Sequence, residues 1–346
     1  MAKMMKPALG NGFRQPLKIE EVPSAAPAPG GTLKSTIKML CKQSLTICAG
    51  LTIAIIATAP CKAIDYQPFD FVPAAPGTVM LMGYYEFGTR NELNNTITGT
   101  SKNQTGLQSQ IGIFRPLYYN QIFDHPYLLE FLLPFGALYN GQINGHQLGD
   151  ASGVSDPILS GTFWPVSRPQ EKTWISVSDW LSVPIGTYNN QRALNLGNNR
   201  WQNDVQLNLT QGLHGPLEKF TFDVSTDWIY YGSNTRAGTG NQTLNQDDTY
   251  NVYTWISYDI SDVMRRAMPS LGQATISAGY AGTFGGDQKL DGVITGSQTK
   301  EQQIRFTYEQ FVAPTWQVLL SFNHDVSVSG QFKQNFGLIF RLTKVF

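Results

Sequence analysis

Apolar and polar residues alternate along most of the chain after residue 77. The chain stops with "NFGLIFRLTKVF", in which Phe336, Leu338, Phe340 and Leu342 fall on one side of an extended strand. A period of two predicts strands with one buried face, and no stretch keeps a helical period over several turns. The pattern predicts twelve strands, over residues 77–90, 104–118, 126–139, 154–164, 173–185, 202–213, 217–231, 249–260, 272–284, 299–311, 315–325 and 335–346.

The connections between the predicted strands alternate in length. The longer ones are rich in Asn, Gly, Gln and Thr, as in "GTYNNQRALNLGNNRW" over residues 186–201. The shorter ones include "HGP" at 214–216 and "VAP" at 312–314. Outer-membrane barrels carry long loops at one end and short turns at the other. The sequence therefore predicts an all-β fold, a transmembrane antiparallel up-and-down β-barrel of about twelve strands.

Aromatic residues near the predicted strand ends favour this fold over a soluble β-sandwich. A sandwich also shows alternation and loops of variable length. It does not need aromatic belts at two levels of its exterior, whereas a membrane barrel does. The aromatics expected in these belts are Tyr84, Tyr85, Phe87, Trp174, Trp180, Trp228, Tyr230, Tyr258, Tyr308 and Trp316.

The first 63 residues are expected to be a leader and not part of the barrel. Residues 45–59 form an uncharged apolar run that follows Lys34, Lys38 and Lys42. This run is shorter than the roughly 20 residues of a membrane-spanning helix, but it fits a signal-peptide core. We place cleavage after Ala63. The predicted organisation is a low-complexity extension plus signal peptide over 1–63, a short lead-in over 64–76 and a barrel over 77–346.

Composition and charge agree with an exported membrane protein. Charged residues make up only 14% of the chain, and the mean hydropathy is −0.20, which suits strands with one apolar and one polar face. Residues 1–63 hold eight of the 25 Lys and Arg and two of the 25 Asp and Glu, leaving 17 basic and 23 acidic side chains. With a net charge of about −6 and no basic patch, no nucleic-acid partner is expected. The expected location is the bacterial outer membrane.

The C-terminal strand and its last residue, Phe346, also support the prediction of a closed barrel. In a closed barrel the last strand pairs with the first, so that no unsatisfied backbone edge faces lipid. A final strand that ends on Phe346 resembles the signature by which outer-membrane proteins are recognised by the assembly machinery, although Lys344 interrupts its apolar side. The expected partners are therefore the lipid bilayer and that machinery.

Three motifs in the middle of the chain resemble a known family. They are "GVSDP" at 153–157, "VPIGTY" at 183–188 and "NLGNNRW" at 195–201, with "APGT" at 75–78 before the first strand. In this order they resemble the outer-membrane family of the MetA pathway of phenol degradation, from about residue 75 to the C-terminus. The matching positions are Gly153, Asp156, Pro157, Pro184, Gly186, Tyr188, Asn195, Gly197, Asn199 and Trp201.

The resemblance implies a barrel that passes small hydrophobic or aromatic compounds by diffusion and needs no cofactor. The motifs also have a purely structural interpretation, because Pro and Gly at strand ends stop the ladder and an Asp before Pro starts a turn. Twelve strands should enclose a narrow lumen, between the filled interior of eight strands and the aqueous channel of sixteen.

Residues on the inward faces are candidates to line the channel. Met and aromatic side chains could contact an apolar solute there, and the charges could either narrow a polar path or pair across the lumen and brace the wall. The channel-lining candidates are Met80, Met82, Tyr84, Glu86, Asp223, Asp227, Tyr253, Trp255, Arg305, Glu309, Asn323 and Arg341.

Two other functions remain open at this point. A rim hydrolase would need a Ser and a His side by side near a strand end, and His324 near Ser321 and Ser327 is the one candidate. A structural or adhesive barrel would bind a partner through its long loops. No metal site is expected, because no Cys lies after residue 63, the histidines are scattered, and Asp247, Asp248 and Asp287 suit solvated loops.

Overall fold

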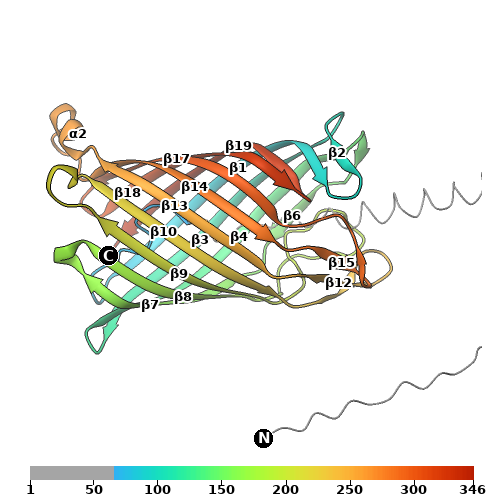
Figure 1. Ribbon diagram of the computed structural model, residues 1–346, viewed down its shortest axis with the longest axis horizontal. Coiled ribbons are helices and arrows are strands. Elements are labelled where there is room, and N and C mark those ends of the chain that lie inside the picture. Colours follow the sequence, from blue (N-terminus) through green and yellow to red (C-terminus); the bar gives the residue numbers. More distant parts are fainter. Residues whose placement is uncertain (1–65) are drawn as a thin grey trace, which may run out of the picture. The chain divides into compact units, whose positions relative to one another are not determined.

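A computed structural model describes residues 66–346, in which twelve long strands follow one another around a closed ring (Figure 1). The predicted leader over 1–63 lies outside the described residues. Each of the twelve predicted strands overlaps one strand of the ring. The strands are β1 (Val79–Asn95), β3 (Gly106–Ile122), β4 (His125–Ile143), β7 (Ile158–Arg168), β8 (Thr173–Ser182), β9 (Gln202–Gly212), β10 (Phe220–Tyr231), β13 (Thr249–Asp259), β14 (Ala274–Gly285), β17 (Lys300–Ala313), β18 (Trp316–Ser329) and β19 (Phe332–Val345).

Short strands and short helices lie at the two ends of the ring. At the end with the long loops, β2 (Gly99–Ser101), β5 (His146–Gln147) and β6 (Ala151–Val154) extend the wall. The loops after β10 and β14 form a second sheet from β11 (Asn234–Ala237), β12 (Gln242–Gln246), β15 (Gln288–Leu290) and β16 (Val293–Ile294). The short-turn end carries η1 (Pro169–Glu171), η2 (Gly215–Leu217) and α2 (Ser261–Ala267). Among residues 66–346, no helix has the length and apolar character needed to cross a membrane.

The ring closes through β1 and β19, which pair antiparallel from Met80 opposite Val345 to Leu93 opposite Phe332. The amide of Phe346 adds one more bond, donating to the carbonyl of Val79 at 2.9 Å. Every strand of the ring therefore has a neighbour on both sides. A sheet closed in this way offers lipid no unpaired edge, and the prediction of a closed antiparallel barrel is confirmed.

Lys344 interrupts the apolar side of the last strand but lies among aromatic rings. Its ammonium nitrogen is 5.1 Å from the ring centre of Trp316 and 5.5 Å from that of Phe346. It also donates a hydrogen bond to the hydroxyl of Thr315 at 2.6 Å. A cation above two rings at the membrane edge gains cation–π attraction while its polar head reaches water.

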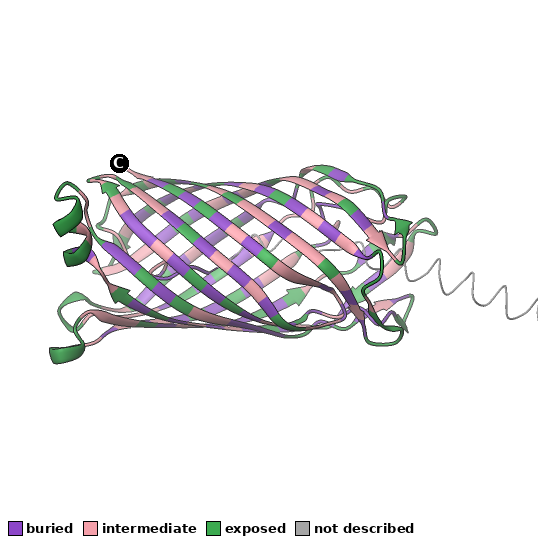
Figure 2. Ribbon diagram, turned by 90° about the horizontal axis from the view of Figure 1, so that it is seen from above, coloured by how far each residue is buried: buried purple, intermediate pink, exposed green. Residues whose placement is uncertain are grey.

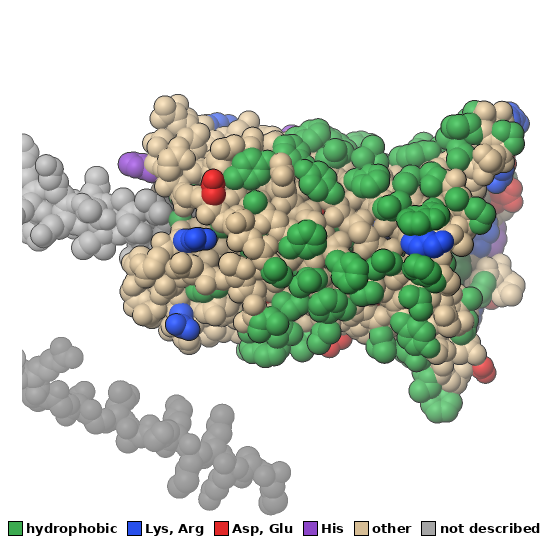
Figure 3. Space-filling view, turned by 180° about the vertical axis from the view of Figure 1, so that it is seen from behind, with side chains coloured by type: hydrophobic (Ala, Val, Ile, Leu, Met, Phe, Trp, Pro, Cys, Tyr) green, Lys and Arg blue, Asp and Glu red, His purple; other side chains and the backbone are tan. Residues whose placement is uncertain are grey.

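The two faces of each strand differ in exposure, as the sequence pattern predicts (Figure 2). On β9, Val205 and Leu207 are exposed, while Gln206 and Asn208 are buried on the other face. Figure 3 shows the result on one side of the barrel, where hydrophobic side chains cover the middle of the wall and the short-turn end, and few lie at the long-loop end. On β9 the apolar face is outside and the polar face is inside, and an apolar outer face is what a wall in lipid requires.

Three of the aromatics expected in the outer belts lie inside the barrel instead. Trp180 is almost fully buried, Trp174 lines an internal cavity, and the hydroxyl of Tyr84 accepts a hydrogen bond from the lumen residue Arg115. Each shares the inward face of its strand with buried neighbours, because side chains alternate strictly along a strand. Position near a strand end therefore does not decide on which face an aromatic lies. Tyr85, Trp228, Tyr230, Tyr258 and Trp316 are exposed as expected.

A disulfide across the closing strands tests the register. Tyr85 and Phe340 are Cα partners, and both face outward. The Tyr85→Cys/Phe340→Cys variant should form a disulfide on oxidation, because paired Cβ atoms lie about 4.5–5.5 Å apart. The bond would join the first and last strands into a loop, so the heated, unreduced protein should migrate faster in a denaturing gel than the reduced one.

A matched control uses the same first position. In Tyr85→Cys/Phe336→Cys the second cysteine lies four residues farther along β19, opposite Thr89. This offset is about 13 Å along the strand, too far for a disulfide. Equal cross-linking in both variants would contradict the register.

Candidate functional site: the barrel lumen

The lumen has one apolar face that runs the length of the barrel. It is formed by the inward side chains of β3, β4 and β7, which are neighbours in the ring. Polar side chains interrupt it at only a few positions, of which Arg115 and Glu130 are charged. The buried apolar residues of this face are Leu107, Ile111, Ile113, Leu117, Tyr119, Leu128, Leu132, Leu138, Ile158 and Trp164.

The part of the lumen wall that begins two strands after β7 is polar. The inward residues of β9 and β10 include Asp204, Gln206, Asn208, Thr210, Asp223, Ser225 and Asp227, and all of them are buried. They bond to one another across the strands. For example, the side-chain amide of Gln206 donates to Asp227 at 2.8 Å, and the hydroxyl of Thr210 donates to Asp223 at 2.5 Å. β13 and β17 continue this face with Asn251, Gln303 and Arg305.

The segment before β1, residues 66–74, folds into the lumen at the short-turn half. Tyr66 and Phe71 are almost fully buried, and their rings stack with centroids 5.2 Å apart. Tyr66 also meets Tyr253 of β13 edge-on at 6.0 Å. On the other side, the indole N–H of Trp164 donates to the carbonyl of Phe71 at 2.8 Å. The segment, called the lead-in below, therefore bridges the apolar and polar walls.

One carboxylate ties the lead-in to the wall. Asp70 accepts a hydrogen bond from Arg341 of β19 at 2.7 Å and lies 3.8 Å from the guanidinium of Arg115 of β3. Arg341 is also 3.4 Å from Glu309, and Arg115 donates to Glu130 at 2.6 Å. All five groups are nearly buried, so solvent screens these contacts little.

The bound lead-in carries two costs. Phe69 has a φ of 63°, in the left-handed region that a bulky residue rarely adopts, and such strain is worth about 1–3 kcal/mol. Gln67 is fully buried, yet neither atom of its side-chain amide has a hydrogen-bond partner. Each such buried group destabilises by about 1–3 kcal/mol. The ion contacts of Asp70 stabilise the bound lead-in, while the strain at Phe69 and the unsatisfied amide of Gln67 destabilise it by a similar amount.

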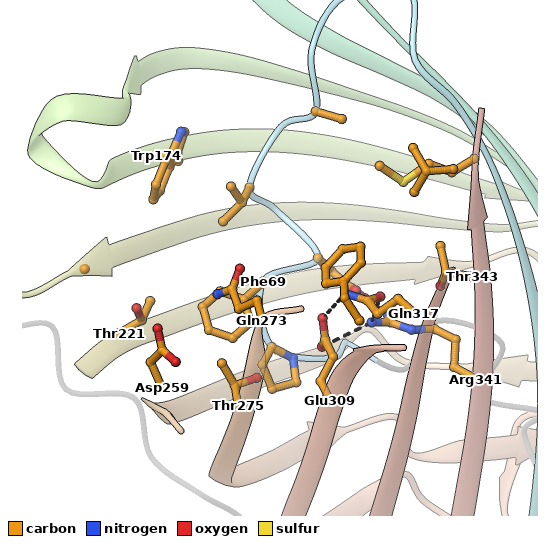
Figure 4. A pocket seen from close by; sticks show the side chains of 18 of the residues that line it. Phe69, Trp174, Thr221, Asp259, Gln273, Thr275, Glu309, Gln317, Arg341 and Thr343 are labelled. Carbon is orange, nitrogen blue, oxygen red and sulfur yellow. Dashed lines mark hydrogen bonds and ion pairs between the residues drawn. The ribbon is translucent and has the colours of Figure 1, made fainter. Parts of the chain in front are cut away.

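Beside the lead-in lies a cavity of about 520 Å³ at the short-turn end (Figure 4). Figure 4 shows Phe69, Trp174, Glu309 and Arg341 around it. Apolar side chains contribute one part of its wall and the ion pairs of Asp70 another. The apolar side chains from the strands include Met80, Met82, Leu117, Tyr119, Trp174 and Phe311.

At the long-loop end, the three sequence motifs meet around Asp156. This residue is nearly buried between β6 and β7, and its carboxylate accepts hydrogen bonds from the amides of Gly186 at 2.9 Å and Asn198 at 2.6 Å. Ser155 donates to the carbonyl of Leu196 at 2.8 Å. The loop of residues 183–201 is thereby fixed to the barrel wall, which agrees with the structural interpretation of these motifs.

Two glycines of the motifs allow this close contact. A Cβ on Gly186 would lie 2.6 Å from the backbone of Asp156, and one on Gly197 would lie 2.8 Å from Gly186. Their packing lets the loop place Leu194 inside the barrel mouth. There a Cβ on Gly141 would meet the side chains of Leu194, Leu148 and Leu107, so these leucines form an apolar cluster.

The remaining motif residues surround this junction. Pro157 accepts a backbone bond from Val183 at 2.9 Å, and Pro184 follows directly. Asn195 accepts from the amide of Asn189 at 2.7 Å, and the hydroxyl of Tyr188 donates to the carbonyl of Arg236 at 3.0 Å. The other three motif positions are Gly153, which packs on Thr187, Asn199, which bonds Asn234, and Trp201, which accepts a backbone bond from Gly232.

The structure brings the predicted channel-lining residues onto inward faces at two levels. Met80, Met82, Tyr84, Glu309, Arg341 and Asp223 lie in the half that holds the lead-in. Glu86, Asp227, Tyr253, Trp255, Arg305 and Asn323 lie nearer the middle and the long loops. Their pairing is extensive: Arg305, for example, donates to Gln303 at 2.6 Å and lies 5.4 Å from the ring centre of Tyr253.

The residues considered for a rim hydrolase do not form a pair. Ser321 is buried in the lumen and bonds Thr307, while His324 projects from the other face of β18 and contacts the carbonyl of Asn335. Within residues 66–346, no three His, Cys, Asp or Glu side chains cluster as metal ligands. Asp247 pairs with Lys289, and Asp248 accepts from Trp228.

Comparison with known proteins identifies the family. Residues 90–342 match the family described as "Putative MetA-pathway of phenol degradation". The chain belongs to this family. The chain is also similar to the COG4313 outer membrane channel from Pseudomonas putida F1, with 27% identity and a TM-score of 0.73 over 82% of this chain and all of the other. No curated protein sequence matches it.

More distant barrels share less with this chain. The translocator domain of the autotransporter NalP from Neisseria meningitidis is 9% identical, with a TM-score of 0.45 over 90% of this chain and 97% of that one. A mutant of the TodX monoaromatic hydrocarbon channel is 11% identical, with a TM-score of 0.44 over 84% and 95%. At this level of similarity neither carries an argument about function.

The sequence did not show that the lead-in occupies the lumen. Its residues were expected to be a short connection before the barrel. One local signal was present, since Tyr66, Phe69 and Phe71 place three aromatics within six residues. A solvated linker rarely holds so many, because aromatic side chains gain most from burial.

The Asp156 junction yields a stability prediction. Asp156→Ala removes the acceptor of two amides, and each loss is worth up to roughly 1–3 kcal/mol. The variant should lose its compact, fast-migrating gel band at a lower temperature than the unaltered protein. Asp150→Ala is the matched control, because Asp150 accepts from the amide of Asn140 at an exposed site. An equal shift in both variants would show that the junction does not fix the loop.

Proposed function

We propose that this barrel is a passive outer-membrane channel for small apolar or aromatic molecules. The single observation that carries the proposal is the apolar face of β3, β4 and β7, which extends through the lumen from Leu107 to Tyr119. A wall of polar side chains alone would bind water and repel such solutes. A mostly apolar face, interrupted by the Arg115–Glu130 pair and a few hydroxyls, lets them exchange water for side-chain contacts along much of the path.

An apolar solute could bind at both ends of this face, on apolar side chains at one end and in a cavity at the other. The leucine cluster around Gly141 lies at the long-loop end, where solute would enter. The cavity of about 520 Å³ lies at the other end. It falls within the roughly 300–1,000 Å³ usual for ligand sites, and about 150 Å³ is already enough for benzene. The family's link to phenol degradation supports an aromatic solute.

In this proposal the described conformation is the closed state, and the lead-in is the part that moves. The strain at Phe69 and the unsatisfied amide of Gln67 disfavour the closed state, while the contacts of Asp70 with Arg341 and Arg115 hold it. Cleavage after Ala63 would leave the lead-in as a free N-terminus, able to leave the lumen without breaking the wall. The leader would direct export, and Phe346 would present the last strand to the assembly machinery.

Uptake by intact cells tests the function. The saccharide-covered outer leaflet slows apolar solutes, so cells that carry the channel should accumulate radiolabelled toluene faster than cells with an empty vector. A sugar of similar mass should show no comparable gain. If the protein is present in the outer membrane and toluene uptake equals that of the empty vector, in the unaltered protein and in the variant below, the proposal is wrong.

Asp70→Asn should shift the protein toward the open state. It keeps the shape of the side chain but removes charged hydrogen bonds worth about 1.5–3 kcal/mol, which raises the open population roughly ten- to hundredfold. Openings in a planar bilayer should become correspondingly more frequent. Asp262→Asn is the control, since Asp262 pairs with Lys219 at 2.8 Å on the exposed surface of the short-turn end.

A further inference from the structure

The carboxylates of the lumen outnumber its arginines. Among strand residues that are less than a tenth exposed, three are arginines, Arg115, Arg305 and Arg341. Seven are acidic: Glu130, Asp204, Asp223, Asp227, Glu301, Glu309 and Asp325. The difference is four negative charges when all of these groups are ionised.

The charges are also unevenly placed around the ring. The three arginines belong to β3, β17 and β19, and Arg115 and Arg341 each lie within 3.5 Å of a carboxylate. β9 and β10 carry Asp204, Asp223 and Asp227 and no buried cation. In the order of the twelve strands, β9 lies six places from β19 and β10 six places from β1. Asp204 on β9 therefore lies across the lumen from Arg341 on β19, while the arginine strands β3 and β17 are three to five places from β9 and β10.

Asp204 and Asp227 are the clearest pair without a countercharge. Neither lies within salt-bridge distance of a Lys or Arg in the described part of the chain, and the side chain of Asp204 makes no hydrogen bond there either. Gln206 of β9 is the Cα partner of Asp227, so Asp204, two residues away, is its diagonal neighbour. Diagonal positions are about 7–8 Å apart, close enough for the two carboxylates to act on one ion.

Buried amide oxygens beside these acids also have no partner. Asn251 donates its amide to Asp227 at 3.1 Å, and its side-chain oxygen accepts nothing. Asn208 donates to Ser176 and Ser178 and likewise has an unpartnered oxygen. Both residues are more than nine-tenths buried. Since buried oxygens normally accept a hydrogen bond or contact a cation, this wall has an excess of acceptors.

We propose that the open channel prefers cations, and that Asp204 and Asp227 on the β9–β10 wall set this preference. The inference rests on the proposed channel function but goes beyond it, because an apolar solute does not require any ion selectivity. Small monovalent cations would pass along the polar wall, with the carboxylates and amide oxygens replacing part of their hydration shell. Anions would be repelled from the same wall.

The size of the effect follows from Coulomb's law. One carboxylate about 7 Å from the ion path, in a water-like medium with salt screening, favours a monovalent cation over an anion by roughly three- to sevenfold. Asp204→Asn is the cleanest variant, because this carboxylate makes no hydrogen bond that the amide would lose. It should lower the ratio of K⁺ to Cl⁻ permeability by about that factor, and Asp204→Asn/Asp227→Asn should lower it further.

The matched control removes a charge at the same height on the outside of the wall. Asp179 lies beside Trp180, the Cα partner of Asp204, but it is exposed on the outer face and bonds Asn203. Asp179→Asn should leave the selectivity unchanged. Retention of the compact gel band in each variant would show that the barrel is intact.

The measurement is the reversal potential across a planar bilayer in a KCl gradient, for the full chain and in the Asp70→Asn background. A reversal potential displaced toward the K⁺ equilibrium potential, reduced by Asp204→Asn and not by Asp179→Asn, supports the proposal. Current with no selectivity, with anion selectivity, or with a selectivity that Asp204→Asn leaves unchanged would overturn it while the channel function stands. The absence of current in both backgrounds would contradict the channel function and this inference together.

Discussion

The rest of the structure depends on one constraint, which is that a wall facing lipid must pair all of its backbone donors and acceptors internally. The pairing of β1 with β19 meets this constraint and makes the ring closed. Closure then fixes the two faces of every strand, one toward lipid and one toward the lumen. Because side chains alternate, every second residue along about a dozen strands is placed inside, whether it is polar or apolar.

The interior that results is neither filled by its own wall nor left as an open aqueous pore. Eight strands give a lumen that side chains fill, and sixteen or more give a channel. Here the lead-in and the leucine cluster of the long-loop end occupy part of the space, and polar and apolar walls face each other across it. In the proposed closed state, a few buried ion contacts of Asp70 offset the local strain at Phe69. A small change in either free energy would therefore shift the populations of the closed and open states.

Much of the fold could be predicted from the sequence because the period of two is a local property. All twelve strands and the inward faces of β1, β10, β13 and β17 followed from it, as did the pairing of the ends. The motif residues were interpreted as strand stops and turns, and Pro157 does stand directly before β7. The bonds from Asp156 to residues 186 and 198 could not be read from spacing, since they join segments 30 and 42 residues apart.

Other features of the structure could not be predicted from the period of two. Trp180 was expected outside because it is an aromatic near a strand end, but the strand's own parity places it in the lumen. The contact of Asp70 with Arg341 spans 271 residues and has no local signature at either end. The unpaired acids of β9 and β10 are likewise visible only when the ring brings all inward charges together, because each one alone is an ordinary polar residue on a strand.

The most direct test of this account is hydrogen exchange of the lead-in, followed by mass spectrometry on the protein in lipid nanodiscs. Amides of residues 66–74 should exchange far more slowly than those of an unstructured peptide of the same sequence, because the segment is packed inside the barrel. Exchange at the rate of the free peptide, with the strands still protected, would show that the lumen is not closed by this segment and would contradict the account.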